Sequence, residues 1–141
     1  MKWNGDALEV EVLVRNGGAG HYVPGGLPGR QIVVRVVALD GAGAELARDE
    51  RIYQRVLVDE LGREVPFYRA VKLGADVRIA PKALRVEHFK LATPAAKKVR
   101  LEVVWRDVSP ELARQLHRAP TPDQLLAGGE LAPGGNAEWR P

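Results

Sequence analysis

Residues 8–15 read LEVEVLVR, with an apolar side chain at every even position. Successive side chains of a strand point to opposite faces, so this alternation predicts a β-strand with one face buried. Residues 97–106 alternate in the same way, with apolar side chains at the odd positions from Val99 to Trp105. Residues 31–39 are apolar on both parities, which is typical of a strand that is covered on both faces.

Less regular strands are expected farther along the chain, each bounded by turn-forming residues such as Gly and Asp. We expect strands at residues 51–58 (after a short helical turn), 65–72, 77–79 and 83–91. In the last of these the apolar phase shifts along the strand, which predicts a β-bulge near His88.

Helices are expected only near the C-terminal end. Ser109 is a good N-cap, and Pro110 suits the first helical position that follows it. Thr121-Pro122 repeats this pattern, so a second short helix is expected to run from there to Gly128-Gly129.

These elements predict an all-β protein, namely an immunoglobulin-like antiparallel β-sandwich with one or two short C-terminal helices. The 141 residues are 45% hydrophobic and 28% charged, which fits one globular domain. We expect a single domain over residues 1–141, with its core at 7–107 and a helical, Gly- and Pro-rich tail at 108–141.

The composition also excludes several classes of protein. The chain has no cysteine, so it can form no disulfide, thiolate metal site or CxxCH haem attachment. No apolar run approaches the ~20 residues that cross a bilayer, so we expect no membrane span. The net charge of +3 comes from basic and acidic residues that are interleaved, so we expect no nucleic-acid partner.

No enzyme motif is present. The sequence lacks the nucleophile-elbow, phosphate-loop and zinc-protease patterns. Neighbouring acids such as Asp49-Glu50 would point to opposite faces of a strand and so could not act as a pair. His88 is expected to face outward on a strand, and His117 is expected to end a helix. We therefore expect no catalytic residues.

The loop at residues 16–30 is the strongest candidate site. It combines glycine, which tolerates unusual backbone angles, with proline, which stiffens the chain. We expect its shape to depend on Asn16, Gly18, Gly20, Pro24, Gly26 and Pro28. An imidazole presented by such a loop can ligate a metal that is held elsewhere, so His21 is the candidate metal ligand. Alternatively, His21 bonds within its own loop and closes the end of the sandwich.

The same loop carries a resemblance. Its string Asn-x-Gly-Ala-Gly-His-x-x-Pro-x-Gly-x-Pro-x-Arg, from Asn16 to Arg30, resembles a loop of the β-sandwich domain at the C-terminal end of multihaem c-type cytochromes. Residues 55–62 and 76–81 are similar to further strands and turns of that family.

The resemblance implies a non-catalytic accessory domain that docks on a haem-bearing module in electron transfer. That module belongs to the same polypeptide or to a separate one, and the chain itself binds no haem covalently. In this picture His21 is an axial ligand of a partner haem or packs on its edge, while Tyr22 and Arg30 contact a haem propionate or the partner surface. Gly25 and Val77 stand where the family usually has threonine.

The resemblance also implies where in the cell the protein is located. An extracytoplasmic, periplasmic site is expected if the chain is part of an exported cytochrome, although its first residues show no apolar signal segment. The alternative function is an autonomous immunoglobulin-like module that binds a protein or a glycan through its end loops. In that case Trp3 and Trp139 are expected to anchor the partner from a single exposed patch.

Overall fold

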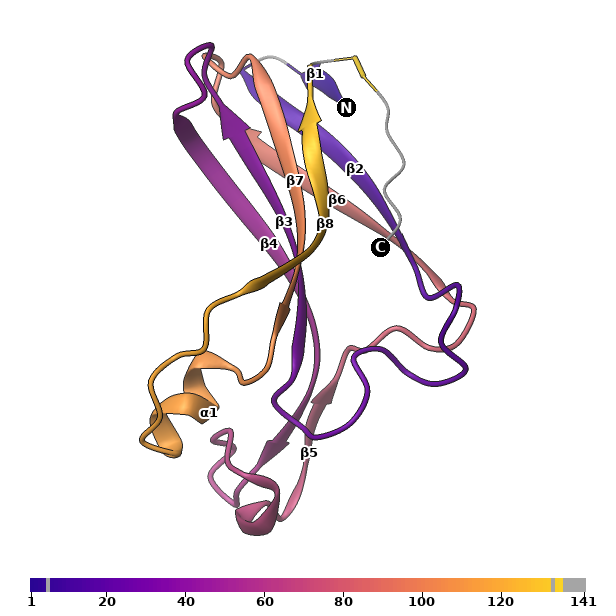
Figure 1. Cartoon of the computed structure of the whole chain (residues 1–141), viewed down its shortest axis with the longest axis vertical. Helices are drawn as coiled ribbons and strands as arrows, with labels where there is room; N and C mark the ends of the chain where they lie inside the picture. The colour runs from indigo at the N-terminus through magenta and orange to yellow at the C-terminus, as the bar shows by residue number, and fades with distance from the viewer. Residues whose placement is uncertain (5, 133, 136–141) are drawn as a thin grey trace.

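The computed structural model describes residues 1–4, 6–132 and 134–135, and their strands form two antiparallel sheets (Figure 1). The smaller sheet has the order β1-β2-β6, and the larger has the order β5-β4-β3-β7-β8. The strands are β1 (Lys2–Asn4), β2 (Ala7–Arg15), β3 (Gln31–Leu39), β4 (Glu45–Val58), β5 (Lys72–Asp76), β6 (Leu84–Ala92), β7 (Lys98–Arg106) and β8 (Gln124–Leu131). The predicted antiparallel β-sandwich is confirmed.

The core lies between the two sheets and follows the alternation seen in the sequence. Every second side chain of the central strand β3 points inward, toward the inner faces of β2 and β6. The inward side chains are Ile32, Val34, Val36 and Ala38 of β3, Leu8, Val10 and Val12 of β2, and Phe89 and Leu91 of β6. Trp105 of β7 packs partly buried against this core, as its parity predicted.

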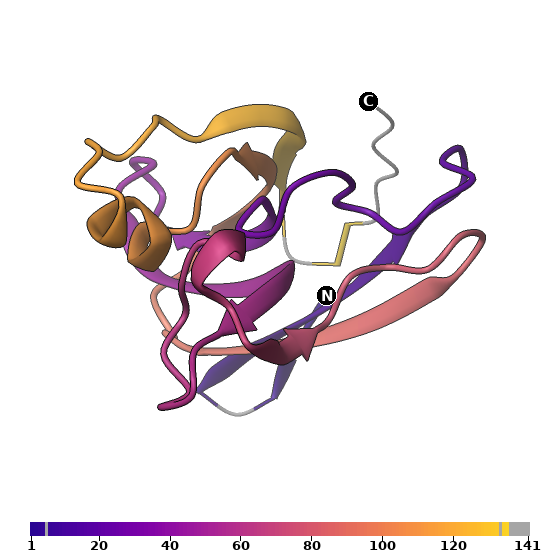
Figure 2. The ribbon, with the colours of Figure 1, turned by 90° about the horizontal axis from the view of Figure 1, so that it is seen from below.

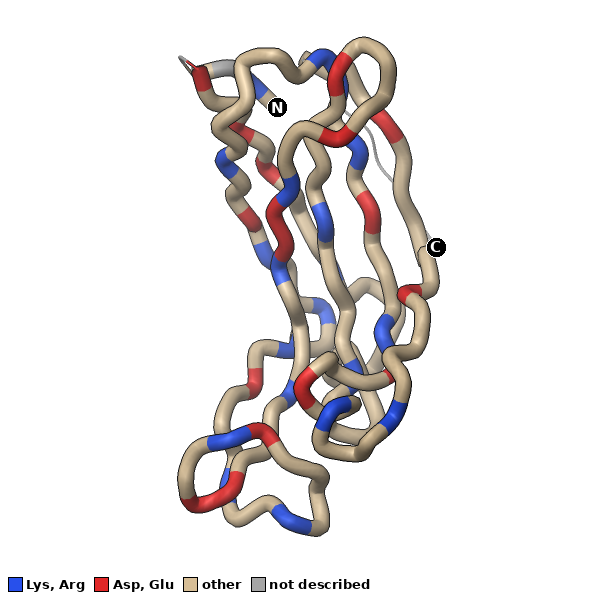
Figure 3. The backbone as a smooth tube through the Cα atoms, turned by 90° about the vertical axis from the view of Figure 1, so that its left-hand side faces the viewer, with Lys and Arg blue, Asp and Glu red and all other residues tan. Residues whose placement is uncertain are grey.

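The opposite face of β3 is buried as well, although it points away from the smaller sheet. Val33 is fully buried there and pairs with Ile52 of β4 and Val104 of β7. Positions of opposite charge lie side by side farther along these strands (Figure 3). Arg35 donates to Glu50 of β4 (2.6 Å) and to Glu102 of β7 (3.0 Å). The aliphatic parts of such long side chains cover apolar neighbours, which explains why β3 is apolar on both faces.

The predicted helix from Thr121 is wrong. Residues Gln124–Leu131 form strand β8, which pairs antiparallel with β7. Asp123, just before the strand, accepts hydrogen bonds from Arg35 (2.8 Å) and Arg106 (2.7 Å) on the face of the sheet. The pairing with β7 and these charged contacts outweigh the local helix signal. The other predicted helix is confirmed as α1 (Pro110–Gln115), where Ser109 accepts a hydrogen bond from the Leu112 N–H.

Two further strand predictions are wrong in detail. The register between β2 and β6 is continuous over the described strands, so there is no bulge near His88. Leu84 and Val86 face away from the core and are exposed, which accounts for the shift in apolar phase. β4 is one strand from Glu45 onward, so the predicted helical turn before residue 51 is absent from this described segment.

The segment between β4 and β6 also differs from prediction. Residues 65–72 do not form a strand, because a short 3-10 turn, η1 (Phe67–Arg69), follows Pro66 and leads into β5. In place of the predicted strand 77–79, Ile79 forms an isolated bridge to Val23, and the Val77 N–H donates to the Gln54 carbonyl oxygen of β4 (3.0 Å).

The two ends of the sandwich are built from different kinds of segment. We call one the turn end (residues 40–44 and 93–97) and the other the loop end (residues 16–30, 59–71, 77–83 and 107–123). Figure 2, seen from below, shows the long loop, η1 and α1 gathered at the loop end. Within the described residues, no helix has the length and apolar character needed to cross a bilayer.

Candidate functional site

Asn16 holds the start of the long loop in place. Its buried side chain donates to the carbonyl oxygens of His21 (2.8 Å) and Ile79 (3.2 Å) and accepts from the Ala19 N–H (3.2 Å). Its backbone N–H donates to the Ala83 carbonyl oxygen (3.0 Å). One residue therefore ties the loop to the segment that leads into β6.

A second set of contacts fixes the middle of the loop. Val23 and Ile79 exchange two backbone hydrogen bonds (2.9 and 2.8 Å). The Arg78 guanidinium lies 5.0 Å from the ring centroid of Tyr22, a cation–π contact. Arg78 also donates twice to Asp76 (2.7 and 2.6 Å), and this pairing holds the pKa of the Asp76 carboxyl below its usual range.

His21 is presented on this framework with one ring nitrogen left over. Its Nδ1 lies 2.8 Å from the Tyr22 carbonyl oxygen. Because a carbonyl can only accept, this contact favours the tautomer of the neutral ring in which Nδ1 carries the proton and Nε2 carries the lone pair. The side chain is exposed, so Nε2 is available to a ligand from outside the chain. A Cβ at Gly25 would lie 2.9 Å from the ring carbon Cε1, so a larger residue at position 25 would displace the ring.

The other predicted loop-shaping residues divide into two groups. Gly26 has φ +79°, and a Cβ there would collide with the Arg30 guanidinium. Gly18 and Gly20 have no atom near the position of a Cβ and no positive φ, so their surroundings do not require glycine. Pro24 is buried within the loop, and Pro28 is half-buried.

Arg30 is set apart from His21 and Tyr22 in its contacts. Its guanidinium lies 5.7 Å from the ring centroid of Trp105, toward the part of the loop that leads into β3. The structure thus places His21 and Tyr22 against the segment 77–83, and Arg30 against β7.

The described residues contain no group of three His, Asp or Glu side chains that could hold a metal ion. His88 is highly exposed on β6, 3.9 Å from a Glu11 oxygen, and His117 follows α1 with φ +52°. His21 can therefore supply one ligand to a metal whose other ligands come from another body.

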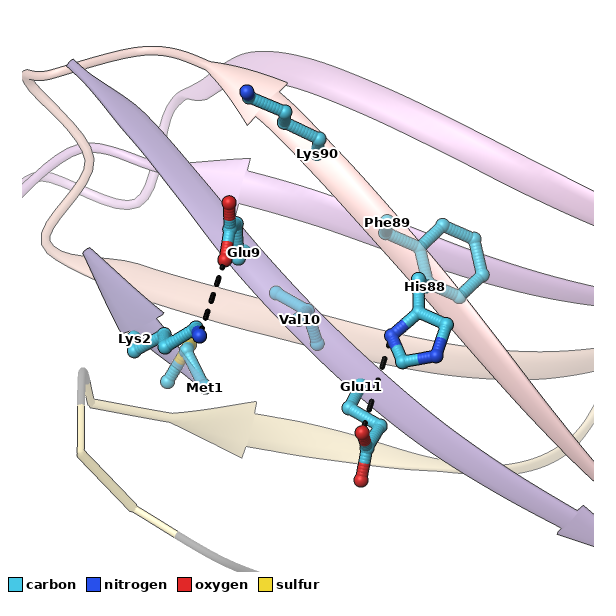
Figure 4. Close-up of a pocket in the computed structure, with 8 residues that line it drawn as sticks. All are labelled: Met1, Lys2, Glu9, Val10, Glu11, His88, Phe89 and Lys90. Carbon is cyan, nitrogen blue, oxygen red and sulfur yellow. Dashed lines mark ion pairs between the residues drawn. The ribbon is translucent and has the colours of Figure 1, made fainter. Parts of the chain in front are cut away.

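Two hollows lie on the surface. The larger, of about 570 Å³, lies over β1, β2 and β6 (Figure 4). On its rim Lys2 pairs with Glu9 (3.5 Å), and a ring nitrogen of His88 lies 3.9 Å from a Glu11 oxygen. The smaller, of about 330 Å³, lies at the loop end.

The comparisons with known proteins give one structural match. No family model matches the chain, and no curated protein matches it. The chain superposes on part of the crystal structure of a penta-heme cytochrome c552 from Thermochromatium tepidum with a TM-score of 0.79 and 24% sequence identity. The match covers 93% of this chain and 37% of the cytochrome chain. The chain shares its fold with part of a multihaem cytochrome.

This match confirms, at the level of the fold, the resemblance seen in the loop from Asn16 to Arg30. Since this chain has no cysteine, it attaches no haem through CxxCH itself. Trp139 and the side chain of Trp3, the two expected anchors for a protein or glycan partner, lie outside the described part of the chain.

Of the residues that line the smaller hollow, sequence reasoning named Pro28 and Arg30 and missed the others. Phe67 and Tyr68 belong to η1, Leu112 belongs to α1, and Leu27 belongs to the long loop, so three distant segments build it. The one available signal was the pair of adjacent aromatic residues after Pro66. Such a pair is unusual in a segment with no regular apolar pattern.

Proposed function

We propose that the chain is a non-catalytic accessory domain that docks on a haem-bearing module in an electron-transfer protein. The fold match to part of a penta-heme cytochrome carries this proposal. The match leaves 63% (100% − 37%) of that cytochrome chain outside the superposed region, and that remainder is where its haems are expected. The haem-bearing module of our protein is in the same polypeptide or in a separate one.

The geometry of His21 supports a contact with haem. Axial ligation needs a neutral imidazole with a free nitrogen, and a hydrogen bond to the other nitrogen orients the ring. The arrangement of His21 suits ligation by the neutral ring, because Nδ1 contacts the Tyr22 carbonyl and the residue is exposed. A bound haem would supply one-electron transfer, while this chain would supply the ligand and its orientation.

The proposal extends to the place where the protein works. Multihaem c-type cytochromes function outside the cytoplasm, so we propose an extracytoplasmic, periplasmic location. The alternative, an autonomous immunoglobulin-like module that binds a protein or a glycan, would need no haem at all.

A haem peptide tests the role of His21. The probe is the ferric haem undecapeptide of a c-type cytochrome, whose iron has one open axial position. We expect the chain to convert this haem from high to low spin in the visible spectrum. His21→Ala should abolish the conversion, whereas His88→Ala, which removes another exposed imidazole, should leave it intact. An equal conversion by wild type and His21→Ala would overturn the proposed ligation.

A further inference from the structure

The arginines of the loop end are of two kinds: Arg63, Arg78 and Arg114 pair with carboxylates, and in the described part of the chain the others do not. On the outer face of the larger sheet Arg35 and Arg106 each pair with carboxylates. Several arginines have no carboxylate within 4 Å among the described residues, and all of them lie at the loop end or at the strand ends that border it. They are Arg15, Arg30, Arg55, Arg69, Arg85 and Arg118. Guanidinium groups that have no carboxylate partner suit an anionic partner.

Apolar side chains are exposed at the same end. Leu27 and Phe67 are each 61% exposed and Tyr68 is 67% exposed, and all three line the smaller hollow. The rings of Phe67 and Tyr68 meet edge to face, with centroids 5.6 Å apart. Clustered apolar surface of this kind marks an interaction site.

The walls of the hollow are held in place before any partner arrives. The Ser109 hydroxyl donates to Glu64 (2.8 Å), which joins the segment carrying η1 to the start of α1. The Ser109 backbone N–H donates to the Gly29 carbonyl oxygen (2.8 Å), which joins α1 to the long loop. A Cβ at Gly29 would collide with Leu112, so the loop packs closely on α1. A preformed hollow lowers the cost of binding.

Two guanidinium groups flank the apolar lining. Arg30 and Arg118 both line the hollow, together with the carboxylate of Asp107. The Oδ1 atom of Asp107 accepts from the Trp105 indole N–H (2.9 Å), so one of its two carboxylate oxygens already has a donor. The hollow thus offers aromatic and aliphatic contacts with two cationic groups beside them.

We propose that this hollow binds the edge of a haem on the haem-bearing module, with its two propionates next to Arg30 and Arg118. A haem edge is flat and apolar and carries two carboxylates, so it matches the lining in shape and charge. The volume of about 330 Å³ suits an edge, with the rest of the group held by the partner. This inference rests on the proposed docking function but does not depend on ligation by His21.

Metal-free mesoporphyrin tests the hollow separately from His21, because it has two propionates and no iron to ligate. In a fluorescence titration, Phe67→Ala combined with Tyr68→Ala should weaken binding about tenfold, since aromatic anchors dominate such contacts. Arg118→Gln should weaken binding about fivefold, as expected for the loss of a charge-assisted contact. The matched controls are Leu46→Ala, an exposed apolar residue of β4 near the turn end, and Arg15→Gln, an unpaired arginine outside the hollow.

The porphyrin dimethyl ester provides the last comparison. It should bind about tenfold more weakly than the diacid, because it carries no charge for the arginines. If the ester binds equally well, or if the double aromatic variant binds like wild type, the hollow is not a haem-edge site. If mesoporphyrin binds as expected while His21→Ala leaves the spin conversion intact, the proposed haem-edge site is supported and the proposed ligation by His21 is overturned.

Discussion

The turn end and the loop end both close the β-sandwich, but different kinds of contact hold them together. At the turn end, Asp40 accepts hydrogen bonds from the N–H groups of Ala42 and Ala44, both at 2.8 Å. These contacts are local. At the loop end the supporting contacts join residues far apart in the chain, such as Asn16 with Ile79 and Ser109 with Glu64.

This difference supports our proposal that the loop end faces the partner. At the turn end the Asp40 carboxylate bonds within its own turn, and the Lys97 N–H donates to the Leu39 carbonyl oxygen (2.8 Å). The loop end uses long-range contacts to hold exposed aromatic and cationic side chains in a defined arrangement. Loops supported in this way on a rigid sandwich are common places for binding sites.

The sharpest comparison uses one glycine from each end. Gly29 (φ +92°) and Gly43 (φ +88°) both have backbone angles that favour glycine. A Cβ at Gly29 would also collide with Leu112, whereas Gly43 has no atom within 4 Å of that position. Gly43→Ala should cost about 1 kcal/mol of stability from the backbone alone. Gly29→Ala should cost about 3 kcal/mol, because overpacking is added.

Urea unfolding of the two glycine variants measures this difference. The m-value should stay unchanged in both, so that the midpoint reports stability. Equal losses at positions 29 and 43 would contradict the close packing of the long loop on α1.

A pair of polar residues gives the next largest effect. Asn16→Ala should cost about 2 kcal/mol, because it removes the Asn16 donor from the part-buried carbonyl of His21 and one of the two donors of the buried Ile79 carbonyl, which keeps the Val23 N–H. Asp40→Ala should cost about 1 kcal/mol or less, since the N–H groups it releases are exposed to water. Thermal unfolding should therefore rank Asn16→Ala as the less stable variant. The reverse order would contradict the claim that the loop end depends more on its side-chain hydrogen bonds than the turn end does.

The ion pairs on the outer face predict a pH dependence with a defined sign. Hydrogen bonding to Arg106 and then to Arg35 holds the pKa of Asp123 below its usual range. The stability it contributes is thus present above the unfolded pKa of about 3.9 and is lost as the pH falls through the folded value. Asp123→Asn should cost about 1 kcal/mol at neutral pH. A cost that stays constant down to pH 2–3, roughly the range below that unfolded value, would refute this assignment.

Glu64, inside the loop end, should show the smallest effect and the opposite sign. Burial raises the pKa of its carboxyl, against the effect of the Ser109 hydrogen bond. The folded state therefore holds the proton more tightly, and stability decreases as the pH rises through the folded pKa. Glu64→Gln keeps an acceptor for Ser109 and removes this loss, so it should gain about 0.5 kcal/mol at neutral pH. A loss of stability at neutral pH would show that the charged form is favoured.

Much of the sandwich could be predicted from periodicity. Residues 31–39, apolar on both parities, were predicted as a doubly covered strand, and β3 has those bounds. β8 was missed because Thr121-Pro122 resembles a helix start, whereas pairing with β7 decides the outcome. A Cβ at Gly128 would lie 2.5 Å from the Leu101 carbonyl oxygen, so glycine here permits the close approach of two strands.

The candidate site could be predicted only in part. The loop motif predicted that Asn16 shapes the loop, and its side-chain hydrogen bonds agree with that role. The hollow could not be predicted, because it depends on contacts between residues such as Leu27, Phe67 and Leu112 that only the tertiary fold brings together. The single-domain boundaries and the role of His21 stay predictions.

The central claim is that this domain works next to haem, and the native polypeptide tests it most directly. An antibody to the domain would capture that polypeptide under native conditions, followed by a denaturing gel stained for haem and a spectrum of the captured material. We predict c-type haem in the captured material, either on a band well above 15.4 kDa or on a partner that is retained in stoichiometric amount. A band at 15.4 kDa with no haem in the captured material would contradict the account and favour an autonomous binding module.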